Sequence, residues 1–404
     1  MIRPTSNAIL PTARGPDSVQ FVVKQPNTKL SIEFDDLWRR HTLFIFADPL
    51  ETEVPPMFPS DGTRVIYLPP GEHQRIIKPQ SDTTYYLAGG AFLSHPADAT
   101  DSSLFYSSRS NKNTHITIRG RGVVSGKFST GSPYLVSLCG IGHRIEGVIW
   151  IEPPQQSILE INAPWSCECG WSCSLPEQTT IENVKLLGWN YADGIHAGSQ
   201  SHVSHCFVRV NDDGVKPFLS DALFEDLVIW QQHNGWAVML AWLTEGIQSN
   251  ITVRNVTILH DDHDHDYPVS GCDPCVPNQA TIGAVQGGSG EVSHVLIDNL
   301  VAETPVWRPF WFGMDKNTWG PTGGGRLAHW TIQGVHMAGG AHNSTILGAK
   351  ASAKNGSHCS IDGLHFHGYK LAGHMVTSPA AAHVSIGRDA CGVDFAADFA
   401  ATQS

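Results

Sequence analysis

The sequence lacks any apolar run of about 18 residues, the length that a membrane-spanning helix requires. Charged residues are scarce, at 16% of the 404 positions, and they sum to a formal net charge of −12. This acidic balance argues against nucleic acid or a membrane surface as a partner, and mildly against a polyanionic substrate. No long segment repeats apolar residues every 3.6 positions, which argues against a helical solenoid.

The segment before residue 16 also lacks the apolar core of a signal peptide. Cysteine usage nevertheless favours an extracellular, secreted protein, because several of the nine cysteines cluster in expected loops where local disulfides can form. A zinc site built from the same thiols is the alternative, and we favour disulfides. The clustered cysteines are Cys167, Cys169, Cys173, Cys272 and Cys275, whereas Cys139 and Cys206 are expected to be buried thiols.

A short phrase recurs along the chain: an apolar residue, a polar residue, then Asn, Asp, Gly or His, followed mostly by apolar residues. A turn-tolerant residue at one fixed place in a short strand indicates a repeat unit. Three successive phrases begin at Ile181, Val203 and Phe224, so the unit is about 20 residues long. The third positions of the nine phrases are Gly120, Gly147, Asn183, His205, Asp226, Asn255, Asn299, Gly334 and Gly363.

A unit of this length is too short for a helix, a strand and their connections, but it fits one coil of a right-handed parallel β-helix. A β-sandwich with irregular strands is the alternative. We therefore predict an all-β solenoid, in which each coil contacts only its neighbours. The expected organisation is a loose tail over 1–15, a small N-terminal β-module over 16–110, the β-helix over 111–375 and a C-terminal cap over 376–404.

Two aspartate clusters lie one repeat apart. Aligning Gly194 with Gly214 sets Asp193 over Asp213 and His196 over Lys216, at an offset of 20 residues. Because coils stack about 4.8 Å apart, Asp193 and Asp213 should lie roughly 5 Å from each other. Adjacent side chains of an extended strand point to opposite faces, so Asp212 can join them only if the chain bends before Gly214. A third glycine, Gly235, is expected to continue the glycine column 21 residues further on.

Three carboxylates on one patch resist joint ionisation, so at least one proton should be held above the usual carboxylic pKa. A protonated carboxyl beside an ionised one is what glycoside hydrolysis needs. Asp193, Asp212 and Asp213 are therefore the candidate catalytic residues. An Asp-Gly pair is ordinarily only a turn, and the evidence for a site is the register of two such pairs.

Residues around the aspartates could bind a sugar substrate. Trp236 and Trp242 are candidate stacking surfaces, since sugar rings pack on aromatic faces. Lys216 and His196 could donate hydrogen bonds to substrate hydroxyls, or could hold the carboxylates in place by charge pairing. Trp230, at the end of an expected strand, is assigned to the core. These residues point to a polysaccharide or oligosaccharide as the partner, and they leave the oligomeric state open.

An acidic, histidine-rich run extends from His260 to Tyr267 and reads HDDHDHDY. Imidazole and carboxylate groups together could bind a divalent cation. The run lacks a defined ligand spacing such as that of a calcium-binding loop, so we favour a solvated acidic loop. We therefore expect neither a metal nor an organic cofactor at the catalytic site.

Three segments between residues 192 and 242 read ADGIHAG, VNDDGVKPF and LVIWQQHNGWAVMLAW, and three upstream segments read LFIFADPLETEVP, YLPPGEH and IRGRGVVSG. They resemble glycoside hydrolase family 49, the dextranase and isopullulanase family, which is related to the family 28 polygalacturonases. The resemblance implies inverting cleavage of an α-linked neutral polysaccharide. It matches Asp212 to the general acid, and Asp193 and Asp213 to the pair that activates water.

The sequence departs from that family in one respect, because only about 100 residues precede the predicted coils, where the family usually carries a substantial β-sandwich. The Gly-His-Gly and Arg-Ile-Lys signatures of polygalacturonases are absent from the expected coils. Two alternatives stay open: a β-helix enzyme, such as a lyase or polygalacturonase, acting on uronic-acid glycans, and a carbohydrate-binding β-helix without catalysis. A lyase would need calcium and a basic residue, for which Lys216 is the candidate.

Overall fold

The computed structural model describes most of the chain, in two units, 1–54 and 55–404, which are treated separately. None of the helices in the described ranges is long and apolar enough to cross a membrane. The described residues are 1–15, 18–34, 41–97, 103–107, 113–129, 134–153, 157–161, 177–188, 192–263, 279–314, 324–348, 359–387 and 389–398.

The first unit contains a three-stranded antiparallel sheet and a separate hairpin. The sheet has the order β1 (Ile2–Arg3), β4 (Thr28–Glu33), β5 (Thr42–Ala47), the hairpin joins β2 (Ala13–Gly15) to β3 (Ser18–Gln20), and η1 (Thr5–Asn7) is a short 3-10 helix. The amino group of Met1 donates to the carbonyl of Glu33 (2.6 Å), and Arg3 forms an ion pair with the Glu33 carboxylate (3.1 Å). The start of the chain is therefore paired, and is not the loose tail that we predicted.

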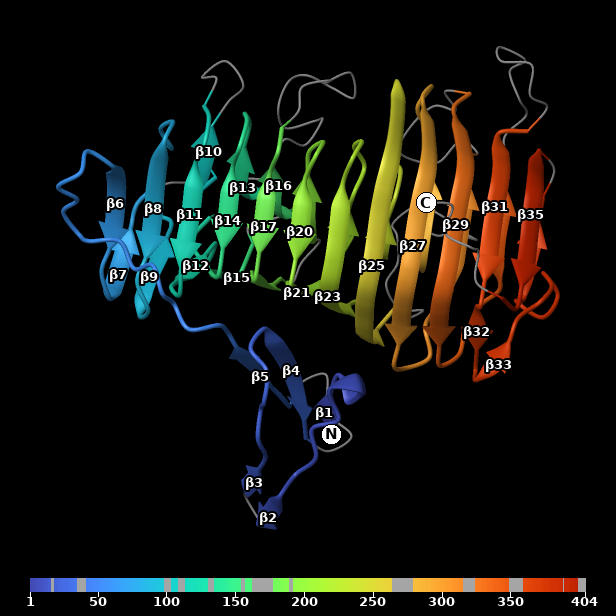
Figure 1. The fold of residues 1–404 in the computed structure, drawn as a ribbon, viewed down its shortest axis with the longest axis horizontal. Helices are drawn as coiled ribbons and strands as arrows, with labels where there is room; N and C mark the ends of the chain where they lie inside the picture. Colours follow the sequence, from blue (N-terminus) through green and yellow to red (C-terminus); the bar gives the residue numbers. More distant parts are fainter. Residues whose placement is uncertain are drawn as a thin grey trace. The chain divides into compact units, whose positions relative to one another are not determined.

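The second unit stacks parallel strands in three ladders, and Figure 1 shows the strands succeeding one another along the solenoid. The first ladder consists of β6 (Arg64–Leu68), β8 (Thr83–Leu87), β11 (Thr117–Gly120), β14 (Arg144–Glu146), β17 (Thr180–Glu182), β20 (His202–Ser204), β23 (Leu223–Gln231), β25 (Ile247–Asp261), β27 (Glu291–Ala302), β29 (Arg326–Met337), β31 (Ile361–His367) and β35 (Ala390–Ala396).

The second ladder runs beside the first and joins it at β23. It consists of β7 (Gly71–Gln74), β9 (Ala91–Ser94), β12 (Val123–Ser125), β15 (Ile149–Ile151), β18 (Lys185–Leu187) and β21 (Phe207–Val210). Near the end of the solenoid, β32 (Lys370–Leu371) continues along β29 and forms a hairpin with β33 (His374–Met375).

The third ladder carries the candidate site. It consists of β10 (Phe105–Ser107), β13 (Tyr134–Leu138), β16 (Ser157–Ile161), β19 (Asp193–Ala197), β22 (Val215–Lys216), β24 (Gly235–Met239), β26 (Gln279–Val285), β28 (Phe310–Gly313), β30 (Ser344–Leu347) and β34 (Val384–Ile386). Coils before β23 cross three ladders, and in later coils one long strand takes the place of the first two, so the predicted right-handed parallel β-helix is confirmed.

The third residue of the repeated phrase forms a corner between the first two ladders. All nine of the predicted positions have a positive φ, for example 54° at Asn183, 55° at Asp226 and 72° at Gly363. Asparagine, aspartate and glycine tolerate this left-handed conformation better than other residues, which is why they recur there. In later coils the corner side chains form a ladder, with Asn255 Nδ2 donating to Asp226 Oδ1 (3.1 Å) and Asn299 Nδ2 donating to Asn255 Oδ1 (2.9 Å).

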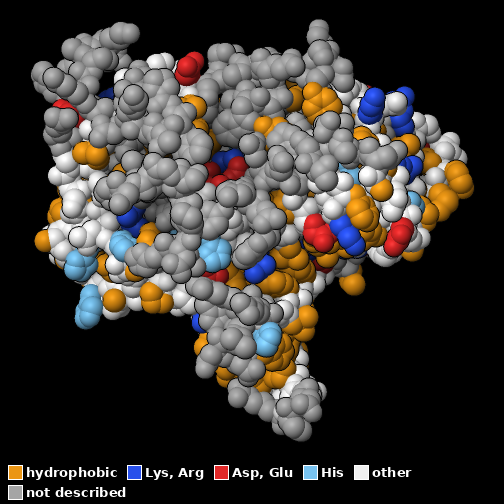
Figure 2. Space-filling view, turned by 180° about the vertical axis from the view of Figure 1, so that it is seen from behind, with side chains coloured by type: hydrophobic (Ala, Val, Ile, Leu, Met, Phe, Trp, Pro, Cys, Tyr) orange, Lys and Arg blue, Asp and Glu red, His pale blue; other side chains and the backbone are white. Residues whose placement is uncertain are grey.

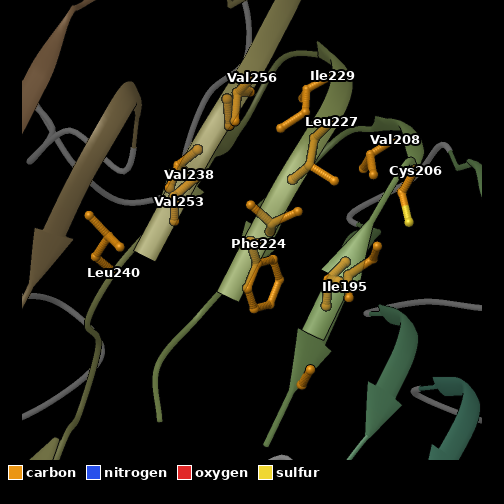
Figure 3. Close-up of a cluster of buried hydrophobic side chains, with 14 of the residues drawn as sticks. Ile195, Cys206, Val208, Phe224, Leu227, Ile229, Val238, Leu240, Val253 and Val256 are labelled. Carbon is orange, nitrogen blue, oxygen red and sulfur yellow. The ribbon is translucent and has the colours of Figure 1, made fainter. Parts of the chain in front are cut away.

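The inward apolar residues of the repeat form one continuous core inside the coils. Figure 3 shows its middle, where Ile195, Phe224, Val238 and Val253 come from neighbouring coils and point into the same interior. Burying each such side chain stabilises the fold by about 1.5–3 kcal/mol. The core therefore fixes which residues of each strand face outward, including those of the candidate site.

The ladders extend beyond the predicted limits of the β-helix at both ends. Strands β6 to β9 pair in parallel with the following coils, so the solenoid includes residues before 111. Strands β34 and β35 add to the third and first ladders, so the segment 376–404 is not an irregular cap. Strands β6 to β9 do not carry the repeated phrase. Strand β35 carries it at Gly392, which has a φ of 61° and stands in register with Gly363, but this phrase is not among the nine identified from the sequence.

The cysteines agree only in part with the sequence analysis. Cys206 is a buried thiol, as predicted, but Cys139 is disulfide-bonded. A further disulfide joins Cys359 to Cys391, whose Cα atoms lie 5.9 Å apart. The predicted loop cysteines, Cys167, Cys169, Cys173, Cys272 and Cys275, lie outside the described residues.

Candidate active site

The two aspartate clusters stack as the repeat predicts. Strands β19 and β22 pair with His196 opposite Lys216, which is the expected offset of 20 residues. The chain bends between β21 and β22, so Asp212 and Asp213 both approach Asp193. One oxygen from each of the three carboxylates lies within 4.8 Å of the other two. The site is therefore a compact cluster of three acidic groups on the third ladder.

Gly235 does not continue the glycine column. Val215 lies opposite Val238, so the register between β22 and β24 is 23 residues, and Gly214 approaches Ala237 instead. Gly235, at a φ of 70°, packs against the aspartates, where an added Cβ would lie 2.4 Å from Asp212 Oδ1. This register is two residues longer than the 21 that would set Gly235 over Gly214, and Gly235 instead lies where only a glycine leaves room for the Asp212 side chain.

Both oxygens of Asp193 are engaged by the next coil. Oδ1 accepts the backbone N–H of Asp213 (3.1 Å), and Oδ2 accepts Lys216 Nζ (2.5 Å). Lys216 Nζ also lies 3.8 Å from the buried carboxylate of Glu160. Burial alone would lower the pKa of Lys216, but Asp193, Glu160 and Asp213 together outweigh burial and raise it. Lys216 is therefore a permanent cation that balances part of the acidic cluster.

The pKa values of Asp212 and Asp213 are both raised above the ordinary carboxylic range. Burial raises the pKa of Asp212 well above its usual range, and the neighbouring charges of Asp193 and Asp213 raise it further. Burial and the charge of Asp193 raise the pKa of Asp213 to about 7, against the opposing effect of Lys216. Because the groups are mutually coupled, the cluster as a whole retains protons near neutral pH.

Hydrogen bonds from the following coil fix the two adjacent aspartates. Asn234 Nδ2 donates to Asp212 Oδ2 (2.8 Å), and Gln231 Nε2 donates to the Asp212 carbonyl (2.7 Å). The backbone N–H of Trp236 donates to Asp213 Oδ1 (3.0 Å). Each carboxyl is thereby held in one orientation before any substrate arrives. Figure 2 shows acidic and basic side chains next to one another near the middle of the face it presents.

A second, buried pair lies behind the Asn234–Gly235 turn. His263 Nδ1 contacts the Asp261 carboxylate, and His263 Nε2 lies 3.1 Å from the carbonyl of Gly235. Both side chains are fully buried. Burial alone would lower the pKa of His263, but Asp261 and the carbonyls of Gly235 and Asn234 raise it. These contacts favour the protonated imidazole, in which both nitrogens donate, and they support the turn that carries Gly235.

The prediction of a solvated acidic loop is wrong for the first half of the run that begins at His260. Residues 260–263 are buried: His260 and Asp261 end strand β25, and Asp262 and His263 follow it directly. Asp262 accepts the indole N–H of Trp230 (2.7 Å), which confirms that Trp230 is a core residue. Residues 264–267 lie outside the described part of the chain.

Two of the predicted substrate-binding residues are inaccessible. Trp236 is fully buried in a small cluster with Phe218 and Met239, which is separate from the core inside the coils. His196 is also fully buried, with Nδ1 3.3 Å from Glu160, and burial lowers its pKa. Packed neighbours cover both rings, including Phe218, which contacts His196 at a centroid distance of 5.1 Å and lies in the same buried cluster as Trp236. They are better described as supports for the cluster.

The two other predicted binding residues differ in exposure. Lys216 is 4% exposed, and its ion pair with Asp193 fits the charge-pairing role that we considered for it. Trp242 is partly exposed and meets Trp236 edge-on, with ring centroids 6.4 Å apart. Trp242 therefore remains a candidate surface for a sugar ring.

Sequence reasoning missed five residues that support the cluster. Glu160 lies opposite His196 in the register of β16 and β19, so extending the column one coil backward would have found it. The others carry no such signal, because Gln231, Asn234, Asp261 and His263 reach the site from turns and strand ends whose register the sequence does not reveal.

Comparison with known proteins confirms the resemblance to dextranases. A segment of 121 residues is 31% identical to the dextranase of Arthrobacter sp. (strain CB-8) and equally to that of Arthrobacter globiformis. The match covers 29% of this chain but only 17% of those dextranases. No protein-family model matches the chain.

Solved structures share the fold over a greater length. Dex49A from Penicillium minioluteum superposes with a TM-score of 0.58 over 98% of this chain and 78% of its own, at 17% identity. A hyperthermoactive exopolygalacturonase from Thermotoga maritima superposes with a TM-score of 0.55 over 82% of this chain and 84% of its own, at 12% identity. At these identities the likeness establishes the parallel β-helix and nothing further.

Proposed function

We propose that the protein is an inverting glycoside hydrolase that cleaves an α-linked neutral polysaccharide of the dextran or pullulan kind. The observation that carries the proposal is the cluster of Asp193, Asp212 and Asp213, in which two carboxyls have raised pKa values beside an ion-paired third. Partial identity to dextranases supports the choice of an α-glucan. A secreted enzyme acting without a metal or organic cofactor fits this chemistry.

Asp212 acts as the general acid. Its carboxyl has the highest tendency to hold a proton, and it is oriented by Asn234. It gives that proton to the glycosidic oxygen as the bond to the anomeric carbon breaks. The departing sugar leaves as an alcohol, and Asp212 is left as a carboxylate.

Asp193 and Asp213 hold and deprotonate the attacking water. Asp193 uses both oxygens for hydrogen bonds to Asp213 N–H and Lys216, which makes it a poor nucleophile but a fixed acceptor. Asp213 takes the proton of the water as its oxygen bonds to the anomeric carbon. This proton then returns to Asp212 through solvent, and the cluster is restored.

The spacing of the carboxyls bears on stereochemistry. Acid and base in inverting glycosidases usually lie about 6.5–9.5 Å apart, whereas retaining enzymes place them about 5–5.5 Å apart. The nearest oxygens here lie within 4.8 Å, which is close to the retaining value. We nevertheless propose inversion, because the hydrogen bonds of Asp193 and Asp213 hold both carboxyls where they can bind and deprotonate a water molecule. The anomeric form of the first product distinguishes inversion from retention.

A lyase mechanism has less support. Lys216 would have to act as the base, but its pKa is raised by the three carboxylates around it, so it holds its proton. Its ammonium also occupies the place beside Asp193 that a calcium ion would need. A uronic-acid glycan would bring further negative charge to an acidic cluster.

Release of reducing ends from a panel of glycans tests the proposal. Wild type, Asp212→Asn and Asp226→Asn are compared on dextran, pullulan, α-1,3-glucan, arabinan and polygalacturonate. Asp226→Asn is the matched control. It makes the same chemical change at a corner residue with a φ of 55°, a conformation that an asparagine, Asn255, already adopts at the corner of the next coil. We expect release from one neutral glucan, unchanged in the control and reduced about 10²-fold or more in Asp212→Asn.

Silence on every neutral glycan would reject the proposal. Release from polygalacturonate alone would assign the enzyme to the uronic-acid glycans instead. Glycan binding that persists in Asp212→Asn, with no reducing ends from wild type, would indicate a carbohydrate-binding protein.

A further inference from the structure

A histidine-rich patch lies on the outer face of the last two strands of the first ladder, away from the aspartate cluster. His365 and His367 stand two positions apart on β31, so both side chains leave the same face of the sheet. Asp394 on β35 lies directly opposite His365. At about 4.8 Å per coil, this patch is roughly 25 Å along the solenoid from the coil of Asp212.

The three side chains converge. His365 Nδ1 lies 2.5 Å from Asp394 Oδ2, and the two imidazole rings have their centroids 6.3 Å apart. One ligand atom from each of the three residues lies within 4.8 Å of the others. His365 and Asp394 are 38% and 53% exposed, so a solvated ion can reach them. His367 Nδ1 is 3.1 Å from the carbonyl of Asp398, which leaves its other ring nitrogen for a ligand role.

Two imidazoles and one carboxylate form the donor set of many zinc sites, in which a water completes the tetrahedron. Imidazole nitrogen favours zinc, nickel and copper, whereas calcium and magnesium require oxygen ligands. Neighbouring ligands of one such ion are about 3 Å apart, a spacing that small side-chain rotations can reach from these positions. The patch therefore fits a divalent transition metal better than a hard cation.

We propose that His365, His367 and Asp394 bind one divalent transition-metal ion, with zinc as the best fit. The ion links β31 to β35 across the last coil, where the Cys359–Cys391 disulfide already joins the same two stretches of chain. Among the described strands of the first ladder, β35 pairs only with β31. A cross-link between these two strands therefore opposes the separation of the last coil from the solenoid. This role is independent of glycan hydrolysis.

Zinc titration of metal-stripped protein against a chromophoric chelator tests the proposal. The site variant is His365→Ala with His367→Ala. The matched control is His294→Ala with His329→Ala, a second pair of neighbouring outward histidines whose rings lie 5.2 Å apart. We expect wild type and control to bind one more tight equivalent of zinc than the site variant at about pH 7.5.

Cobalt supplies an independent readout of the ligand set. In wild type and control, bound Co²⁺ should give the visible absorption of a four-coordinate ion, and Asp394→Asn should weaken its binding about 10-fold or more. Zinc should also raise the melting temperature of wild type and control but not of the site variant. Equal stoichiometry and equal cobalt spectra in wild type and site variant would overturn the proposal.

Discussion

Removal of the buried imidazole behind the catalytic turn should be costly. In His263→Ala the Asp261 carboxylate loses its cationic partner and keeps only the Thr281 hydroxyl (2.8 Å) among the hydrogen bonds described for it. Breaking one side of a fully buried ion pair typically costs about 3–5 kcal/mol of unfolding free energy. The Gly235 carbonyl also loses its donor, so the turn against Asp212 loosens and kcat should fall.

The pH dependence of that cost has a definite sign. The pKa of His263 is raised in the folded protein, so its stabilising effect is complete below the unfolded value of about 6.5. It is lost as pH rises through the folded pKa. The difference in stability between wild type and His263→Ala should therefore be largest near pH 6 and should shrink on going to alkaline pH.

Urea denaturation followed by tryptophan fluorescence at several pH values measures this difference. Asp261→Asn with His263→Gln is the control, because replacing both partners by neutral residues leaves no uncompensated charge. We expect the double variant to be more stable than His263→Ala. A cost below about 1 kcal/mol at pH 6, or a cost that grows with pH, would refute the assignment of a buried imidazolium.

Three further predictions follow from the geometry of the site. Asp213→Asn should abolish activity, yet its unfolding free energy should exceed that of wild type increasingly as pH rises from 4 to 8, by up to about 4 kcal/mol in urea titrations. The reason is that folding raises the pKa of Asp213 from 3.8 to about 7, and each pH unit between these values is worth about 1.4 kcal/mol. No gain in stability would show that the pKa of Asp213 is not raised in the folded protein. Gly235→Ala should lower kcat by about tenfold or more, because the added Cβ would displace the Asp212 side chain. Gly373→Ala is the control, since Gly373 also has a positive φ but has open space around it, and kcat should not change. Equal effects would show that the space beside Asp212 does not matter. Trp236 is buried, so Trp236→Ala should lower the unfolding free energy by about 3–5 kcal/mol. Trp242 is partly exposed, so Trp242→Ala should mainly raise KM in glucan hydrolysis. The reverse pattern would show that Trp236 contacts the substrate.

The repeat of the solenoid could be predicted because one position in each coil is conformationally special. A left-handed corner admits few residue types, so the sequence records it at residues such as Asn183, Asp226 and Gly363. The register of Asp193 with Asp213 followed directly from it. The N-terminal coils lack this marker in their strands, and their pairing became visible only in the structure. The last coil carries the marker at Gly392 (φ 61°), outside the nine phrases identified from the sequence.

The supports of the site could not be predicted in the same way. The register between β22 and β24 is 23 residues, so Gly214 approaches Ala237 and not Gly235, and Trp236, expected at the surface, is buried. The contact between His263 and Gly235 joins segments 28 residues apart through a strand end. Such contacts depend on loop lengths and side-chain packing, which leave no periodic pattern in the sequence.

The anomeric form of the first product tests the central claim most directly. An α-linked glucan oligosaccharide is mixed with wild type, and the anomeric protons are followed by NMR before mutarotation is complete. The account predicts that the β-anomer appears first, and that Asp212→Asn gives no product on the same timescale. An α-anomer first would show that a carboxylate attacks the sugar, and an undiminished rate in Asp212→Asn would remove the acid from the mechanism.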